Sequence, residues 1–324
     1  MSDRWGAKFV ALSVIWGSSF ALIKVAVDAG VSPLWVALWR CLFGALALWV
    51  ICLVRRVAVP RDRRTWGHAC VVAVLLNAVP FALFAYGETQ VSSVLAGVWN
   101  ATTPLTTLVF ALALVPEEHP TRRRALGLLL GFVGVLVVLG AWRGVGGGLL
   151  AGSLACLAAT TCYGAGFACT RRFFSGDRHT ASALSAVQIT CATAQLALIT
   201  PVVSGGPVWP GAAAAAALIV LGAVGTGLAY VFNLDVIRAA GSTIASTVTY
   251  VTPLWSTLLG ALFLAEPVGW NTVVGGVLVI GGVLFSRARG SAGGGERRVD
   301  HDLAVRADEE HHERGESRTP GARA

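Results

Sequence analysis

Few side chains of this chain could do chemistry, and the most unusual are polar groups set deep in long apolar stretches. Arg40 lies seven residues inside the apolar stretch 33–54, and no acidic residue is close to it in the sequence. A guanidinium in such a place either anchors an anionic group, such as a carboxylate, or packs against the carbonyl groups of neighbouring helices. Gln188 occupies roughly the corresponding place in the stretch 179–201, and we expect it to be a neutral, hydrogen-bonding counterpart of Arg40.

Two prolines lie in the middle of apolar stretches, and both are flanked by polar side chains. Pro104 follows an asparagine and two threonines, and Pro253 follows a tyrosine and several threonines. A proline inside a helix removes a backbone donor and frees the carbonyl four residues earlier. A kinked, polar-lined helix predicts a binding site with a hinge, and the alternative is a static kink whose threonines bond their own backbone.

Polar and aromatic groups deep in the apolar stretches are the expected lining of a substrate site. Rigid aromatic walls suit an amphipathic or aromatic molecule, and the alternative for each aromatic is ordinary packing. The expected substrate-binding residues are Trp16, Ser19, Arg40, Asn77, Trp99, Asn100, Thr103, Tyr163, Gln188, Tyr250, Thr252 and Trp255. Gln195 and Tyr230 are weaker candidates. Lys24 and Asp28, four residues apart, are expected to form a gate or an ion pair at the membrane interface.

The motifs of several other kinds of chemistry are absent from this sequence. It contains no GxxxxGK[ST] phosphate loop, no HExxH and no GxSxG, so neither ATP hydrolysis nor these hydrolytic sites are expected. The carboxylates of Glu88, Glu117, Asp235 and Glu266 lie at the ends of apolar stretches. Proton-coupled carriers commonly use a buried carboxylate, so coupling would use Glu88 or Asp235, or transport would run down a gradient. We expect no cofactor and no metal, and we expect the cysteines to be packing residues.

The composition of the chain requires a lipid bilayer as solvent. Of its 324 residues 55% are hydrophobic and 13% charged, and the mean hydropathy is +0.70. A soluble domain carries about 25% charged residues. An apolar helix crosses the hydrocarbon layer in about 20 residues, and ten stretches have this character. The predicted transmembrane helices are 7–27, 33–54, 66–86, 90–115, 122–142, 149–170, 179–201, 211–233, 241–264 and 268–286.

The distribution of basic residues predicts the orientation of these helices. With the N-terminus inside, sixteen lysines and arginines flank the cytoplasmic helix ends, and the outer loops contain Arg143 alone. Both termini are therefore expected in the cytoplasm of a bacterial cell, with the helices in its inner membrane. The net charge of +8 reflects this topology, and no nucleic-acid partner is expected. Residues 287–324 carry balanced charges and few large apolar side chains, which predicts a disordered cytoplasmic tail.

The ten apolar stretches form two copies of five. Residues 16–21 are matched 147 residues later by 163–168, and 103–105 are matched 149 residues later by 252–254. A repeat with an odd number of crossings must enter the bilayer from opposite sides, as in the inverted repeats of secondary transporters. Glycine rows in the fifth and tenth helices predict a scaffold or a subunit contact. The expected domains are a five-helix repeat over 1–145, a second over 146–286 and the tail over 287–324.

These features together resemble the drug/metabolite transporter superfamily, specifically its EamA type, over about residues 8–286. The resemblance rests on the pattern Trp-Gly-Ser-Ser-Phe at 16–20, on Arg40, on the two centred prolines and on the acidic residues that close their helices. It implies an all-α integral membrane protein that acts as a secondary carrier, often an exporter of amino acids or related compounds.

The expected function is therefore transport of a small metabolite by alternating access. With Arg40 as an anchor, the substrate would be amino-acid-like or another carboxylate, and export is expected over import. The alternatives are efflux of drugs or lipophilic cations on the same fold, a membrane-embedded lipid-modifying enzyme, and a scaffold that transports nothing. The partners are the substrate and the bilayer, and the sequence leaves monomer and homodimer open.

Overall fold

The computed structural model describes residues 4–88, 90, 99–118, 121–138, 150–264 and 269–287, and in these residues it contains helices and no strand. The first half holds α1 (Arg4–Asp28), α2 (Pro33–Val54), α3 (Arg63–Ala73), η1 (Val74–Ala78), α4 (Val79–Glu88), α6 (Thr103–Leu114) and α7 (Arg122–Val138). The second half holds α8 (Leu150–Phe174), α9 (Ala181–Ser204), α10 (Ala212–Gly222), η3 (Ala223–Leu228), α11 (Ala229–Ala240), α12 (Ser242–Ser246), α13 (Val248–Leu264) and α14 (Trp270–Arg287).

The all-helical architecture is confirmed, and each predicted stretch contains helix where it is described. Among the described residues, five stretches of helix are long and apolar enough to cross a membrane, namely Pro33–Val54, Arg63–Phe84, Leu150–Phe174, Ala181–Ser204 and Ala212–Ala240. The count of ten spans, the inverted repeat and the orientation stay predictions. The predicted disordered tail lies outside the described residues, beyond Arg287.

Two of the long spans contain a π-helical segment at corresponding places. The segment η1 joins α3 to α4, and η3 joins α10 to α11. The two segments begin at Val74 and Ala223, 149 residues apart, which is the offset of the repeated threonine and proline in the sequence. The wider turn of a π-helix disturbs the regular backbone ladder, and such segments are frequent at functional sites.

Glycines let α1 and α8 approach their partner helices in the same way. A Cβ atom added at Gly17 would lie 2.6 Å from the Cβ of Trp255 in α13. A Cβ atom added at Gly164 would lie 2.7 Å from the Cβ of Thr106 in α6. The glycines are 147 residues apart and their partners 149, so these two contacts correspond under the predicted repeat.

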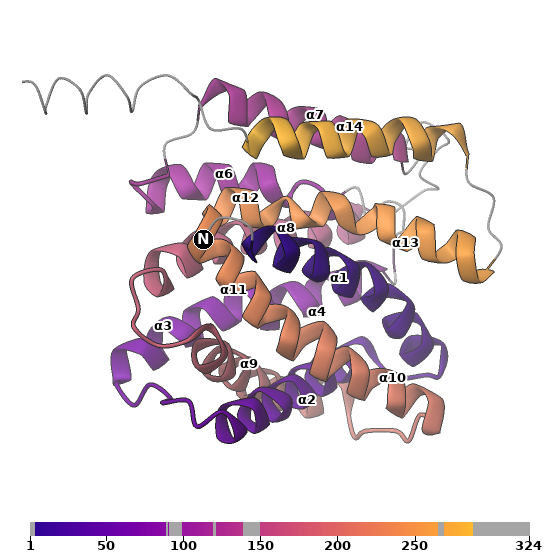
Figure 1. The fold of residues 1–324 in the computed structure, drawn as a ribbon. Coiled ribbons are helices and arrows are strands. Elements are labelled where there is room, and N and C mark those ends of the chain that lie inside the picture. Colours follow the sequence, from indigo (N-terminus) through magenta and orange to yellow (C-terminus); the bar gives the residue numbers. More distant parts are fainter. Residues whose placement is uncertain are drawn as a thin grey trace, which may run out of the picture. The chain divides into compact units, whose positions relative to one another are not determined.

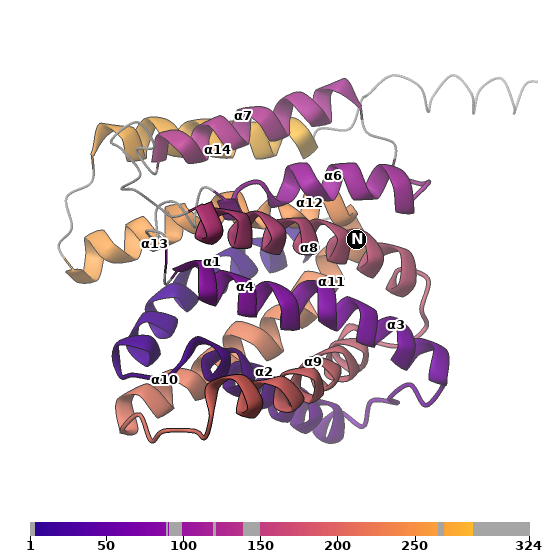
Figure 2. The ribbon, with the colours of Figure 1, turned by 180° about the vertical axis from the view of Figure 1, so that it is seen from behind.

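The glycine rows of α7 and α14 pack against each other, and the two helices lie side by side in both views (Figures 1 and 2). A Cβ atom at Gly275 would lie 2.7 Å from the carbonyl oxygen of Gly134, and one at Gly127 would lie 2.8 Å from that of Gly282. Small residues permit such backbone contact, which is a main source of helix association in lipid.

Replacement of Gly282 by alanine should therefore lower the thermal stability of the detergent-purified protein. The added methyl group would lie 2.7 Å from the Gly127 carbonyl oxygen, and overpacking of this kind costs about 1–3 kcal/mol. Gly281→Ala is the matched control, because a Cβ atom there meets nothing within 4 Å. Equal melting temperatures for the two variants would contradict the packing of α7 on α14.

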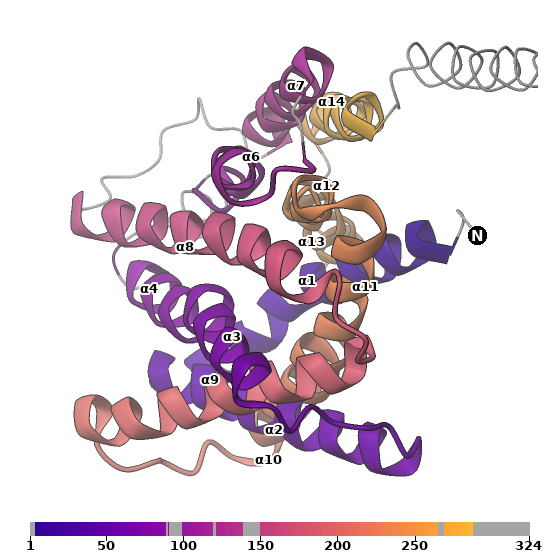
Figure 3. The same cartoon turned by 90° about the vertical axis from the view of Figure 1, so that its left-hand side faces the viewer.

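The helices α1, α4, α8 and α11 lie between two groups of other helices. Figure 3 shows α1, α4, α8 and α11 with α2, α9 and α10 on one side and α6, α7, α12, α13 and α14 on the other. The polar contacts described below join α2 to η3 and α9 to η1.

Candidate functional site

Arg40 lies in the first half of α2 and contacts both π-containing spans. Its Nε donates a hydrogen bond of 3.2 Å to Thr226 Oγ1 in η3, and its guanidinium carbon lies 3.9 Å from the centre of the Phe81 ring in α4. Among the described residues no carboxylate pairs with Arg40, and no protein group accepts from its terminal N–H groups. A partly exposed cation with free donors is suited to bind an anion.

Gln188 in α9 and Asn77 in η1 form a second pair, at positions that correspond to Arg40 and Thr226 under the predicted repeat. Gln188 Nε2 donates a hydrogen bond of 2.9 Å to Asn77 Oδ1, and both side chains are buried. Gln188 follows Arg40 by 148 residues, and Asn77 precedes Thr226 by 149. The buried Nδ2 of Asn77 has no hydrogen-bond acceptor within the part of the chain that the structure describes.

Each π-helical segment also offers one backbone carbonyl to an aromatic side chain. The Tyr230 hydroxyl donates to the Leu76 carbonyl at 2.9 Å, and Trp16 Nε1 donates to the Gly225 carbonyl at 3.2 Å. Leu76 and Gly225 are 149 residues apart. The rings of Trp16 and Tyr230 meet edge to face, with 6.1 Å between their centres. Interior carbonyls that helical bonds leave free need such donors at membrane depth.

We call Arg40, Asn77, Gln188, Thr226 and Tyr230 the central polar cluster.

An aromatic wall continues from the central polar cluster toward α8. Tyr163 stacks on Phe84 with 5.8 Å between ring centres, and Phe84 and Trp99 pack around Cys156. The buried Nε1 of Trp99 has no acceptor among the residues that are described.

Other predicted site residues lie elsewhere or use their polar atoms locally. Tyr250 is fully buried, and its hydroxyl donates to the Leu128 carbonyl of α7 at 2.9 Å. Trp255 Nε1 donates to Ser13 Oγ at 2.8 Å and so joins α13 to α1. The hydroxyls of Ser19, Thr103 and Thr252 donate to backbone carbonyls three or four residues earlier in the chain. For the two threonines this is the arrangement expected beside a static kink.

The structure corrects the predicted position of Pro104. This proline lies in the first turn of α6, where its missing N–H is not needed, and the turn at 101–102 precedes it. The Asn100 carbonyl accepts from the Thr103 hydroxyl at 2.7 Å. The mid-helix placement is therefore wrong for Pro104, whereas Pro253 does lie inside α13. The side chains of Lys24 and Asp28 lie outside the described residues.

Glu118 is a buried carboxylate that the sequence analysis missed. Its two oxygens accept from the backbone N–H groups and hydroxyls of Ser242 and Thr243, at distances of 2.5–3.3 Å. Arg171 Nε lies 3.7 Å from its Oε1, and the same guanidinium donates to the carbonyls of Ile237 and Arg238. These contacts join the end of α6 to α8, α11 and α12.

We call Glu118, Arg171, Ser242 and Thr243 the Glu118 junction. Glu117, the carboxylate that the sequence pattern places at the end of this helix, is exposed.

Two further contacts fasten the same ends of the helices. Lys8 of α1 forms an ion pair with Asp235 of α11. Arg238 of α11 donates to the carbonyls of Phe174 and His179, at 2.9 Å and 3.0 Å. The charge distribution predicts that this end of the helices is cytoplasmic.

Comparison with known proteins relates this chain to membrane transporters. The family model of the EamA-like transporter family matches residues 4–140 and again residues 150–288. The chain is 24% identical over 276 residues to the uncharacterized transporter YdfC of Bacillus subtilis, covering 84% of this chain and 87% of that one. A match to the protein PagO of Salmonella typhimurium, 28% identical over 112 residues, spans only 34% of this chain and 36% of PagO.

A solved structure shares the fold. A crystal structure superimposes with a TM-score of 0.75 and 21% identity, and the match covers 88% of this chain and 97% of that one.

The helical fold with membrane-capable helices and the sequence comparisons define the class, a multi-pass membrane transporter. The chain belongs to the EamA-like transporter family, within the drug/metabolite transporter superfamily. The resemblance inferred from the sequence motifs is thereby confirmed.

Proposed function

We propose that this transporter moves a small metabolite bearing a carboxylate, and that the carboxylate binds at the central polar cluster. The observation that carries the proposal is the guanidinium of Arg40, whose terminal N–H groups have no protein acceptor among the described residues. Asn77 Nδ2 and Trp99 Nε1 are further buried donors without acceptors in that part of the chain. A carboxylate offers only acceptors and complements such a set, whereas a lipophilic cation would meet the charge of Arg40.

Several observations support two inverted repeats of five helices as the frame of this site. The family model matches the chain twice, and the π-helical segments begin 149 residues apart. Arg40 with Thr226 and Gln188 with Asn77 are repeat-related pairs that each join a helix of one half to the π-helical segment of the other. A site built equally from both halves suits a carrier whose halves exchange roles.

We further propose that the Glu118 junction closes the cytoplasmic end of the transport pathway. The conformation of this structure is then the one closed at that end. Support comes from its contacts, which tie α6 and α8 to α11 and α12 through a buried carboxylate. Under the repeat, Arg171 and Ser242 correspond to Lys24 and Ser93 at the opposite end. Alternating access would then exchange closure between the two ends, with bending at Pro253 and export as the net direction.

A ligand screen tests the carboxylate proposal. The melting temperature of the detergent-purified protein is measured with amino acids, small dicarboxylates, nucleosides, sugars and tetraphenylphosphonium. A ligand at about 100 times its dissociation constant stabilises the folded state by about 2.7 kcal/mol. We expect stabilisation by a carboxylate and none by its methyl ester or amide. Stabilisation by the cation alone would replace the proposal with lipophilic-cation efflux.

A further inference from the structure

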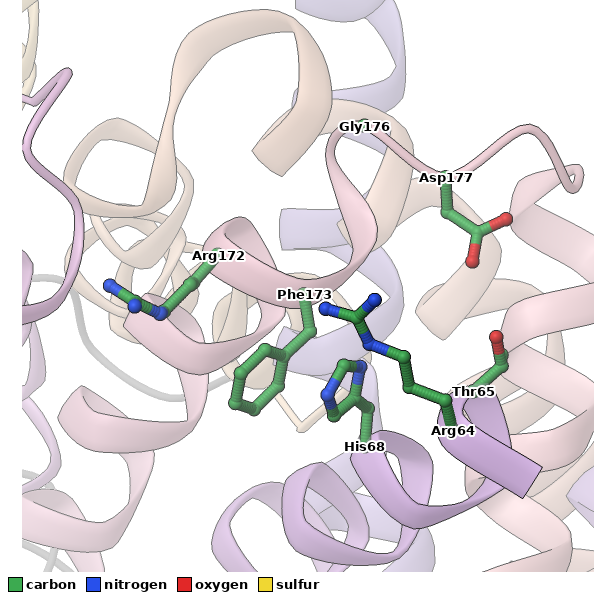
Figure 4. A pocket seen from close by; sticks show the side chains of 7 residues that line it. All are labelled: Arg64, Thr65, His68, Arg172, Phe173, Gly176 and Asp177. Carbon is green, nitrogen blue, oxygen red and sulfur yellow. The ribbon is translucent and has the colours of Figure 1, made fainter. Parts of the chain in front are cut away.

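A cavity separate from the central polar cluster lies between the beginning of α3 and the end of α8. Its volume is about 340 Å³, and it is lined by Arg64, Thr65 and His68 from α3 and by Arg172, Phe173, Gly176 and Asp177 from α8 and the loop that follows (Figure 4). The apolar spans Arg63–Phe84 and Leu150–Phe174 end beside it. The cavity therefore lies at the depth of the lipid head groups, whichever way the protein is oriented.

The free charges of this cavity are positive. Arg64 lies in the first turn of α3, and its guanidinium forms no ion pair or hydrogen bond with the residues that the structure describes. Arg172 uses one N–H group on the Leu114 carbonyl, at 2.7 Å, and keeps its other donors. In the view of Figure 4, the guanidinium of Arg64 lies beside the His68 ring, and that of Arg172 lies beyond Phe173.

The nearby carboxylates are already engaged. Asp177 Oδ1 accepts from the backbone N–H and the ring Nδ1 of His179, at 2.8 Å and 2.6 Å. Asp62 caps α3 by accepting from the Thr65 backbone N–H at 2.7 Å, and this bond lowers the pKa of Asp62. Neither carboxylate pairs with Arg64 in the described part of the chain, so the guanidinium is free for an external anion.

The side chain of His68 is held as one wall of the cavity. It stacks on Phe173 with 4.1 Å between ring centres and 9° between ring planes, which fixes the imidazole against α8. The imidazole N–H and the Arg64 guanidinium beside it form a donor set that matches the oxygens of a phosphate group, and Arg172 adds positive charge on the far side of Phe173. Basic pockets between spans at the cytoplasmic surface are a known form of site for anionic lipid head groups.

We propose that this cavity binds a phosphate group, presented by the head group of an anionic phospholipid such as phosphatidylglycerol. The volume of about 340 Å³ exceeds that of one phosphate and leaves room for the glycerol of the head group. The bound lipid would bridge α3 and α8, which come from different halves of the chain. The site is independent of the transported substrate.

Native mass spectrometry of the full-length protein tests the proposal, with phosphatidylglycerol, phosphatidylcholine and inorganic phosphate as probes. We expect phosphatidylglycerol to bind in preference to phosphatidylcholine, and Arg64→Ala to weaken that binding about tenfold, the effect of one lost charge-assisted hydrogen bond. Arg63→Ala is the matched control, because Arg63 is an exposed arginine of the same turn that does not line the cavity. Since Arg64 has no protein partner in the described residues, its loss should leave the fold intact, and the melting temperature without lipid verifies this.

The three probes distinguish a lipid head group from free phosphate as the source of the bound phosphate group. If inorganic phosphate binds with the same dependence on Arg64, the site takes a free phosphate, and the shared chemistry is upheld. If Arg63→Ala and Arg64→Ala weaken lipid binding equally, general surface charge explains it and the proposal is overturned. Equal binding of the two lipids, with no binding of inorganic phosphate, overturns it as well.

Discussion

Replacing Arg40 by glutamine should lower the affinity for a carboxylate substrate by about 10- to 100-fold, the largest effect expected from any single change at the central polar cluster. A hydrogen bond to a charged group contributes about 1.5–3 kcal/mol, and tenfold in affinity corresponds to about 1.4 kcal/mol. Glutamine keeps a donor near Thr226 but removes the charge that would face the substrate. The measurement is the dissociation constant of the ligand found in the thermal screen, followed by its flux in proteoliposomes.

Arg55→Gln is the control for that experiment. Arg55 follows α2 directly, so the same charge is removed close to the same helix, but its side chain is exposed and far along the chain from the cluster. Arg40→Lys should recover part of the affinity, because a point charge is restored without the planar donors. If Arg40→Gln folds normally and binds the carboxylate as tightly as the wild type, Arg40 is a packing residue and the anion anchor must be sought elsewhere.

Glu118→Ala should release the Glu118 junction and lower the stability of the whole protein. The substitution leaves the donors of Ser242 and Thr243 without their acceptor and Arg171 without its carboxylate. Removing one partner of a buried charged pair costs about 3–5 kcal/mol. The direct measurement is hydrogen–deuterium exchange at the amides of Ser242 and Thr243, which should become faster by about 100-fold if at least about 2.7 kcal/mol of protection is lost.

Glu117→Ala provides a matched comparison, because Glu117 is the exposed neighbour of Glu118. This substitution should leave hydrogen–deuterium exchange at the amides of Ser242 and Thr243 unchanged. Glu118→Gln keeps the volume of the side chain, but its amide group would present donors to the donors of Thr243, so an intermediate effect is expected. Equal exchange in wild type and Glu118→Ala would remove the junction from the proposed closure of the cytoplasmic end.

Periodicity and length in the sequence predicted the helices well, because each apolar stretch must be helical to satisfy its own backbone in lipid. The repeat was also visible in the sequence, and it related Gln188 to Arg40 before their contacts were known. What the two residues contact was not visible. Their partners, Asn77 and Thr226, lie in π-helical segments, and one extra residue in a helical turn changes the side-chain directions without changing the composition.

Two details of the candidate site depended on helix ends that a pattern does not define. Pro104 lies in the first turn of α6, after a turn at 101–102, whereas the sequence pattern alone predicted a continuous helix there. Glu117 and Glu118 are adjacent and identical in type, so only the path of the chain after α6 decides which carboxylate turns toward Ser242.

The sequence by itself determined that this protein is a helical membrane transporter, because composition, segment length and the repeated motifs are all local properties of the chain. Only the tertiary structure decided which polar groups meet. It brought Arg40, Asn77, Gln188, Thr226 and Tyr230 together and directed Tyr250 toward α7. The physical reason is that hydrogen bonds and charge pairs act over a few ångströms, and the rotation of each helix about its axis is set by its packing neighbours.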